Sequence, residues 1–105
     1  MMIVTDRTDY TFDGIKHDLL YGYDTENKNF AFVAILNYNI SAELTATNDI
    51  YHNEEQLIQA INESRTYKGT TETVHNLAVF ITIQLEKLKE IWDKPLFYEN
   101  EPPIQ

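Results

Sequence analysis

Cysteine is absent from the 105 residues, and glycine and proline occur only three times each. Without cysteine there is no disulfide bond and no thiolate zinc site. The glycines are isolated at Gly14, Gly22 and Gly69, so the sequence has no phosphate-binding glycine loop. No apolar run approaches the roughly 18 residues that span a bilayer, and no basic region followed by an apolar stretch indicates a signal peptide. We therefore expect a cytoplasmic protein without a membrane partner.

Basic residues are also scarce. Eight Lys and Arg stand against 17 Asp and Glu, which gives a formal net charge of −9. Such a chain repels phosphate backbones, so direct nucleic-acid binding is not expected, and a basic protein is its natural complement. Acidity that only keeps the protein soluble is the alternative. The hydrophobic fraction of 43% suffices for one folded core.

Four segments of the first half have the patterns of strands. Asp13-Gly14 is typical of a type I′ turn, and it predicts a hairpin between residues 8–12 and 15–23. Residues 30–38 are apolar on both faces, which predicts a central strand covered on both sides. Residues 40–47 alternate in polarity and predict a fourth strand.

The second half has helical periodicity. Asn53 with Gln56 resembles a capping box and predicts a helix over 53–68, with Gly69 just after its end. A stripe of apolar residues at helical spacing predicts a second helix, which Pro95 ends. The residues of this stripe are Val74, Leu77, Ala78, Ile81, Leu85, Leu88 and Trp92. The predicted fold is a single α+β domain over 1–97, a short antiparallel β-sheet of about four strands followed by two α-helices. Residues 98–105 are expected to be a flexible C-terminal tail.

The hairpin register places Asp9 directly opposite Asp18. Like charges in such a pair destabilise a sheet, unless Arg7 and Lys16 on the same face offset them. We favour this charge stripe. The alternative is a carboxylate dyad that holds a divalent metal, as in a small metal-dependent hydrolase.

The three histidines show no metal-binding spacing, since no two of them stand three or four residues apart. His17 alternates with apolar residues and is expected at the edge of the core. The sequence thus indicates no catalytic residue, metal site or cofactor, and we do not expect an enzyme.

A docking patch is the remaining candidate site. Around the predicted first helix, Arg65 and Lys68 are the only bases, at the far end of a run of acids. If the sheet edge lies beside the start of this helix, carboxylates from several segments cluster there. The expected binding residues, including two tyrosines as anchors, are Asp9, Asp18, Tyr21, Tyr23, Asp24, Glu26, Glu43, Asp49, Glu54 and Glu55.

In its size, its acidity and its plan of a sheet with helices, the chain resembles in type the small anti-CRISPR proteins that phages and mobile elements direct against Cas9. This resemblance implies an inhibitor in the cytoplasm of a bacterial host, monomeric or homodimeric, whose carboxylates stand in for phosphates on a basic partner such as a Cas9–guide RNA complex. A structural or assembly homo-oligomer of a phage, formed through an apolar stripe of Phe80, Ile83 and Ile91, is a further alternative.

Overall fold

A two-residue turn sets the geometry of the first half of the chain. The structure, a computed structural model, describes residues 2–27, 29–45 and 49–93. Strands β1 (Ile3–Phe12) and β2 (Ile15–Asp24) flank the turn. Asp13 and Gly14 both have positive φ, 54° and 79°, as a type I′ turn requires. The predicted turn is confirmed, although β1 begins five residues earlier than the predicted strand because its first half pairs with the second half of β2.

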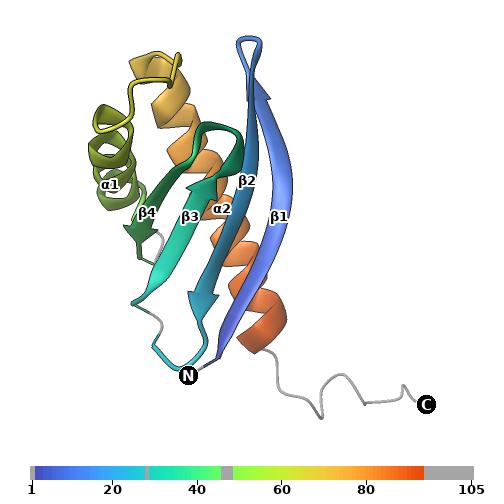
Figure 1. Ribbon diagram of the computed structural model, residues 1–105. Helices are drawn as coiled ribbons and strands as arrows, with labels where there is room; N and C mark the ends of the chain where they lie inside the picture. The colour runs from blue at the N-terminus through green and yellow to red at the C-terminus, as the bar shows by residue number, and fades with distance from the viewer. Residues whose placement is uncertain (1, 28, 46–48, 94–105) are drawn as a thin grey trace, which may run out of the picture.

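The sheet is an antiparallel meander in the order β1-β2-β3-β4 (Figure 1). β3 spans Ala31–Ile35 and β4 spans Ile40–Leu44. The predicted third strand was too long at its end, because Leu36–Tyr38 form a 3₁₀ turn that Asn39 closes with φ 56°. The predicted fourth strand ends at Leu44, and residues 46–48 lie outside the described part of the chain.

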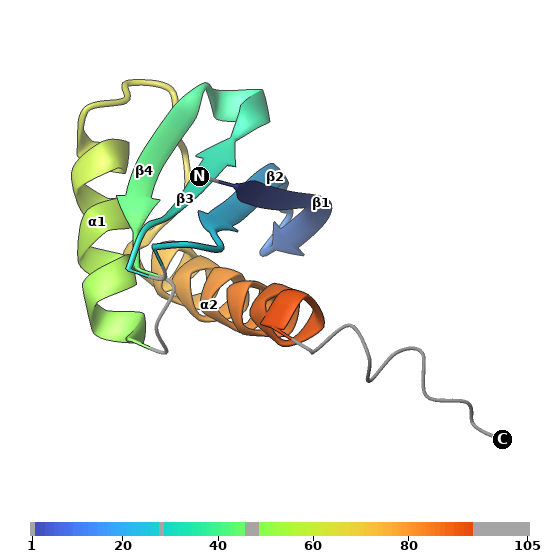
Figure 2. The ribbon, with the colours of Figure 1, turned by 90° about the horizontal axis from the view of Figure 1, so that it is seen from below.

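Both helices lie on one face of the sheet, as Figure 2 shows. They are α1 (Ile50–Asn62) and α2 (Thr71–Asp93). The prediction that β3 is covered on both sides is therefore wrong. Its second apolar face, with Phe32 and Ala34, is half-buried without a helix on it. Phe32 instead lies over Gly22, where a Cβ would collide with the Phe32 ring and the Val4 carbonyl oxygen. The single α+β domain, a four-stranded antiparallel sheet followed by two helices, is as predicted.

The predicted stripe of α2 forms the centre of the core. Leu77, Ala78 and Ile81 are fully buried, and Leu85 nearly so. Phe80 stacks on Tyr10 of β1 with 4.4 Å between ring centroids. The side chain of Trp92, Pro95 and the predicted tail 98–105 fall outside the described residues.

The start of α1 differs from the prediction. Asp49, not Asn53, is the N-cap: its carboxylate accepts a hydrogen bond from the backbone N–H of His52 at 3.0 Å. Asn53 lies inside the helix and is fully buried. Its Oδ1 accepts from the backbone N–H of Thr45 at 3.1 Å, and its Nδ2 donates to Thr82 Oγ1 at 3.0 Å. Asn53 therefore joins the end of β4 to both helices. The helix also ends earlier than predicted, at Asn62, so that Arg65 and Lys68 lie in the connection to α2.

We expect Asn53→Ala to lower the free energy of unfolding by about 3 kcal/mol, because it removes the hydrogen bonds of a fully buried amide to Thr45 and Thr82 and opens a cavity. Asp49→Ala, which removes only an exposed cap, should cost about 1 kcal/mol. Urea denaturation of both variants measures the two values. An equal or larger loss in Asp49→Ala would contradict the assignment of Asn53 as the joint between the elements.

Candidate binding surface

Three of the ten residues predicted to bind a partner are buried. Tyr21 and Tyr23 are 2% and 0% exposed, because the hairpin register turns both toward the helices. Asp24 is 6% exposed, and its carboxylate accepts from the backbone N–H of Glu26 at 2.9 Å. The two tyrosines therefore belong to the core and Asp24 closes the β2–β3 turn. None of the three offers a contact surface, which corrects the prediction for these positions.

The Tyr21 hydroxyl contributes to cohesion between layers. It lies 3.3 Å from Gln84 Oε1 on α2 and 3.4 Å from Asp6 Oδ2 on β1. Burial, with the Asp6 carboxylate beside it, raises the pKa of Tyr21 to about 12. The hydroxyl therefore stays protonated at neutral pH and can donate its single proton to either of these two oxygens.

Asp9 and Asp18 form the predicted opposed pair, and each has a basic neighbour. Arg7 donates two hydrogen bonds to Asp18, from Nε to Oδ1 at 3.2 Å and from Nη2 to Oδ2 at 2.9 Å. Lys16 Nζ lies 3.7 Å from Asp9 Oδ2. The hydrogen bond from Arg7 holds the pKa of Asp18 below its usual value. A carboxylate dyad that shares a proton needs the opposite shift, so the arrangement is that of the predicted charge stripe.

Titration of the protein with Mg²⁺ or Mn²⁺ should give no tight binding, because the two carboxylates are already compensated by Arg7 and Lys16. Among the described residues, no group of three or more Asp, Glu or His side chains is placed to hold a metal ion. Calorimetry measures this directly. Micromolar binding of either metal that Asp9→Asn abolishes would instead support the hydrolase alternative.

Glu26, Glu43 and Asp49 are all exposed and come to the same end of the molecule. There β2 turns into β3, β4 ends and α1 begins (Figure 1). The pairing of Phe32 with Glu43 and of Ala31 with Leu44 fixes this arrangement. The expected proximity of the sheet edge to the start of α1 is thus present. Asp9 and Asp18 stand apart from this group, in the half of the hairpin nearer its turn.

The outer stripe of α1 holds an exposed aromatic ring that the sequence prediction missed. Tyr51 is 81% exposed, and Glu54, Glu55 and Ile58 follow it three, four and seven residues later on the same stripe. With His75 of α2, these four residues line a shallow hollow of about 470 Å³. Glu54 Oε1 lies 2.9 Å from His75 Nδ1, which fixes the carboxylate at the rim. We call Asp49, Tyr51, Glu54 and Glu55 the α1 acidic surface.

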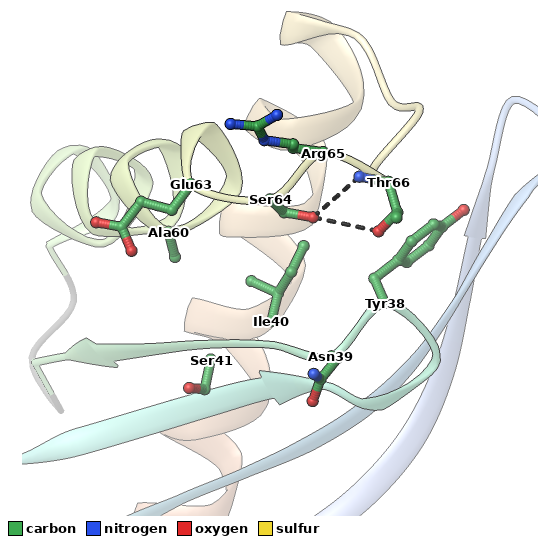
Figure 3. A pocket seen from close by; sticks show the side chains of 9 residues that line it. All are labelled: Tyr38, Asn39, Ile40, Ser41, Ala60, Glu63, Ser64, Arg65 and Thr66. Atoms are coloured by element: carbon green, nitrogen blue, oxygen red, sulfur yellow. Dashed lines mark hydrogen bonds between the residues drawn. The ribbon is translucent and has the colours of Figure 1, made fainter.

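A second hollow, of about 450 Å³, lies between the start of β4 and the connection after α1 (Figure 3). Its lining is mixed, with Tyr38, Asn39, Ile40 and Ser41 on the sheet side. The Ser64 hydroxyl pairs with the Thr66 hydroxyl at 3.2 Å and also accepts from the Thr66 backbone N–H at 3.3 Å. These hydroxyls serve to close a tight turn. The hollow is therefore best explained as the seam between the connection and the sheet.

The fully buried His17 ties this connection to the core. Its Nδ1 lies 3.0 Å from the Tyr10 carbonyl oxygen, which can only accept, so Nδ1 carries the proton. Nε2 then accepts from the Tyr67 hydroxyl at 2.8 Å. Burial lowers the pKa of His17 and raises the pKa of Tyr67 to about 12. A neutral histidine and a protonated tyrosine thus hold residue 67 against β2.

The described residues therefore define a small α+β protein in which several exposed carboxylates lie around α1 and the adjoining end of the sheet. Residues 10–80, more than half of the chain, match the "Family of unknown function (DUF6618)". The chain belongs to this family. No curated protein and no solved structure matches the chain. No helix in the described part of the chain is long and apolar enough to cross a membrane.

We expect the protein to lose stability as the pH falls below about 6.5, the ordinary pKa of histidine. The pKa of His17 is lower in the folded state, so the unfolded chain takes up the proton first. This contribution to stability is complete above that pH and is lost below it. Urea denaturation at about pH 7.5 and about pH 5.5 measures it.

The matched variants are His17→Phe and His52→Gln, because His52 is not in the core. His17→Phe should flatten the pH dependence over this interval, whereas His52→Gln should preserve it. A pH dependence unchanged by His17→Phe would show that another group is responsible.

Proposed function

We propose that this protein binds a basic surface of another protein and inhibits it by occupying a site that otherwise meets nucleic acid. The supporting observation is the α1 acidic surface, in which the exposed carboxylates of Asp49 and Glu55 and the half-buried carboxylate of Glu54 surround an 81% exposed tyrosine. No Lys or Arg occurs between Lys28 and Arg65, whereas five acids do: Glu43, Asp49, Glu54, Glu55 and Glu63. The proposal replaces the buried anchors Tyr21 and Tyr23 with Tyr51.

The physics of such a contact has two parts. The net charge of −9 attracts a basic partner over a distance of about one Debye length and raises the association rate. Contact affinity then depends on a few residues, and tyrosine is enriched among them because it offers a rigid ring with one polar group. Arginine of the partner can stack on the Tyr51 ring while Glu54 or Glu55 binds its guanidinium group. The exposed acids at Glu26 and Glu43 extend the negative field over the neighbouring end of the sheet.

A Cas9-type effector with its guide RNA is the first partner to test. Such effectors hold nucleic acid in a positively charged channel and read a short duplex motif with arginines. The resemblance of this chain to small anti-CRISPR proteins points to the same partner class. The carboxylates of the α1 acidic surface would compete for side chains that otherwise contact phosphates.

We expect the protein to prevent a preformed Cas9–guide complex from shifting a target duplex in a mobility assay, and to do so less well at higher salt. Glu55→Lys and Tyr51→Ala should each weaken inhibition about tenfold or more, since reversed charge at a contact and loss of a central aromatic cost this much. Glu54→Lys tests the carboxylate of the surface that lies beside His75.

Glu90→Lys is the matched control, because Glu90 is exposed on α2 and the substitution changes the net charge by the same amount. Equal weakening by Glu90→Lys and Glu55→Lys would show that overall charge, not the α1 acidic surface, carries the effect. A full duplex shift at every protein concentration, with normal target cleavage, would remove Cas9 as the partner.

A homo-oligomer remains the second candidate, because α2 exposes two large apolar side chains. Ile83 is 45% and Ile91 is 61% exposed. Phe80, the third member of the predicted stripe, is instead half-buried against Tyr10. Sedimentation of an Ile83→Glu variant tests this alternative, because an oligomer formed through this stripe of α2 should dissociate when a charge is placed in it.

A further inference from the structure

The outer edge of β1 is open among the described residues, since β1 is terminal in the sheet order and is ten residues long. In a two-residue hairpin, pairs alternate between hydrogen-bonded and non-bonded ones. Phe12 and Ile15 flank the turn and form a hydrogen-bonded pair, so Tyr10 and Thr8, two and four residues before Phe12, also point their backbone groups inward to β2. The backbone groups of Thr5, Arg7, Asp9 and Thr11 therefore point outward.

One contact supports this direction. The Arg7 backbone N–H donates to the Asp6 carboxylate of its own strand at 2.8 Å, which an inward N–H would not do. An unpaired edge of this length is a template for another strand. Proteins blunt such an edge with proline, a bulge or charged side chains. β1 contains neither proline nor a break in its pairing with β2, and its charged residues, Asp6, Arg7 and Asp9, are of both signs.

We propose that a second copy of this chain pairs with the edge, antiparallel and centred on Thr8, so that the two sheets become one continuous sheet. The sequence of β1 is self-complementary about this residue. In the register that joins the outward groups, Arg7 lies opposite the partner's Asp9, and Thr5 lies opposite the partner's Thr11. On the helix-facing side, Asp6 meets the partner's Tyr10 and Val4 meets the partner's Phe12. The Arg7–Asp9, Thr5–Thr11 and Val4–Phe12 pairs are of favourable cross-strand types, and each pair occurs twice by symmetry.

The charges favour this register over its neighbours. Centring the pair on Arg7 would place the two Arg7 residues opposite each other. Centring it on Asp9 would place the two Asp9 residues opposite each other and leave Arg7 opposite the partner's Thr11, without an acid. In the Thr8-centred register, the partner's Arg7 meets Asp9, whose side chain is 62% exposed and has only Lys16 at 3.7 Å. Asp9 thereby gains a second cation beside Lys16.

The flank of α2 next to β1 agrees with the same placement. Phe80 stacks on Tyr10 of β1, and Ile91 lies on the same helical stripe, eleven residues later. Figure 2 shows α2 running beneath β2 and β1. A second copy on the β1 edge would therefore stand beside the 61% exposed Ile91 and the half-buried Thr8, Tyr10 and Phe12.

Sedimentation velocity of the full chain, over a series from micromolar to millimolar concentration, should show a monomer–dimer equilibrium. Arg7→Asp and Asp9→Arg should each raise the dimer dissociation constant about tenfold or more, because each places like charges opposite each other twice. The double variant Arg7→Asp with Asp9→Arg restores opposite charges across the edge and should recover the dimer. Asp9→Arg keeps an acid, Asp18, opposite its new cation and should stay folded.

Thr5→Pro and Thr11→Pro give an independent test. Both N–H groups point outward, so proline should leave the β1–β2 pairing intact and prevent strand addition. Thermal unfolding checks that each variant is folded. A monomer at millimolar wild-type concentration would overturn the proposal. An unchanged dimer dissociation constant in the folded variants Asp9→Arg and Thr5→Pro would also overturn it, because the dimer would then form through a surface other than the β1 edge.

Discussion

The register of the β1–β2 hairpin determines most of what the rest of the molecule can do. Side chains of a strand alternate between faces, so a slip of one residue would exchange the two faces of β2 completely. The Asp13-Gly14 turn prevents that slip, since its positive φ angles fit a two-residue connection. His17, Leu19, Tyr21 and Tyr23 consequently face the helices, and Arg7, Asp9, Lys16 and Asp18 face solvent. The same register decides which backbone groups of β1 point outward.

Because the helices cover one face of the sheet and leave the other in solvent, the fold determines where the charged side chains can act. Helices α1 and α2 take the core-facing side of the sheet, and the opposite side bears the charge stripe and Phe32 over Gly22. The stripe compensates itself through Arg7 and Lys16, so it contributes little to a negative field. Other acids, Glu43, Asp49 and Glu55, lie around α1 and the end of β4, in a part of the sequence without lysine or arginine. The location of the proposed binding surface thus follows from where lysine and arginine are absent, more than from where acids are many.

The sequence sufficed for elements whose signals are local. The Asp13-Gly14 turn, the pairing of Asp9 with Asp18 and the buried stripe through Leu77 and Ile81 depend on neighbours along the chain, and all are confirmed. Asn53 was misassigned because its partners Thr45 and Thr82 come from two other elements. A polar residue near a helix start resembles a cap until those partners are known.

Tyr51 and Tyr23 illustrate the same limit for the candidate surface. Residue type does not distinguish a tyrosine that is 81% exposed from one that is 0% exposed. The difference arises from placement: Tyr51 stands off the apolar stripe of α1, and Tyr23 ends the core-facing row of β2. That Tyr51 lies off the apolar stripe of α1 could be read from the helical periodicity of the sequence. The burial of Tyr23 required knowledge that both helices cover that face.

The two proposed interactions make opposite demands on charge. Binding to a basic protein gains from the net charge of −9, and salt weakens that attraction. Pairing of two copies is opposed by the same net charge, and salt screens this repulsion. Self-association is therefore tolerable only where the local charges alternate and lie far from the acidic end. Strand β1 meets this condition, because Arg7 stands between Asp6 and Asp9, and it lies across the sheet from α1. A dimer joined at β1 would present its two α1 acidic surfaces at opposite ends, so that one assembly could hold two copies of a basic partner.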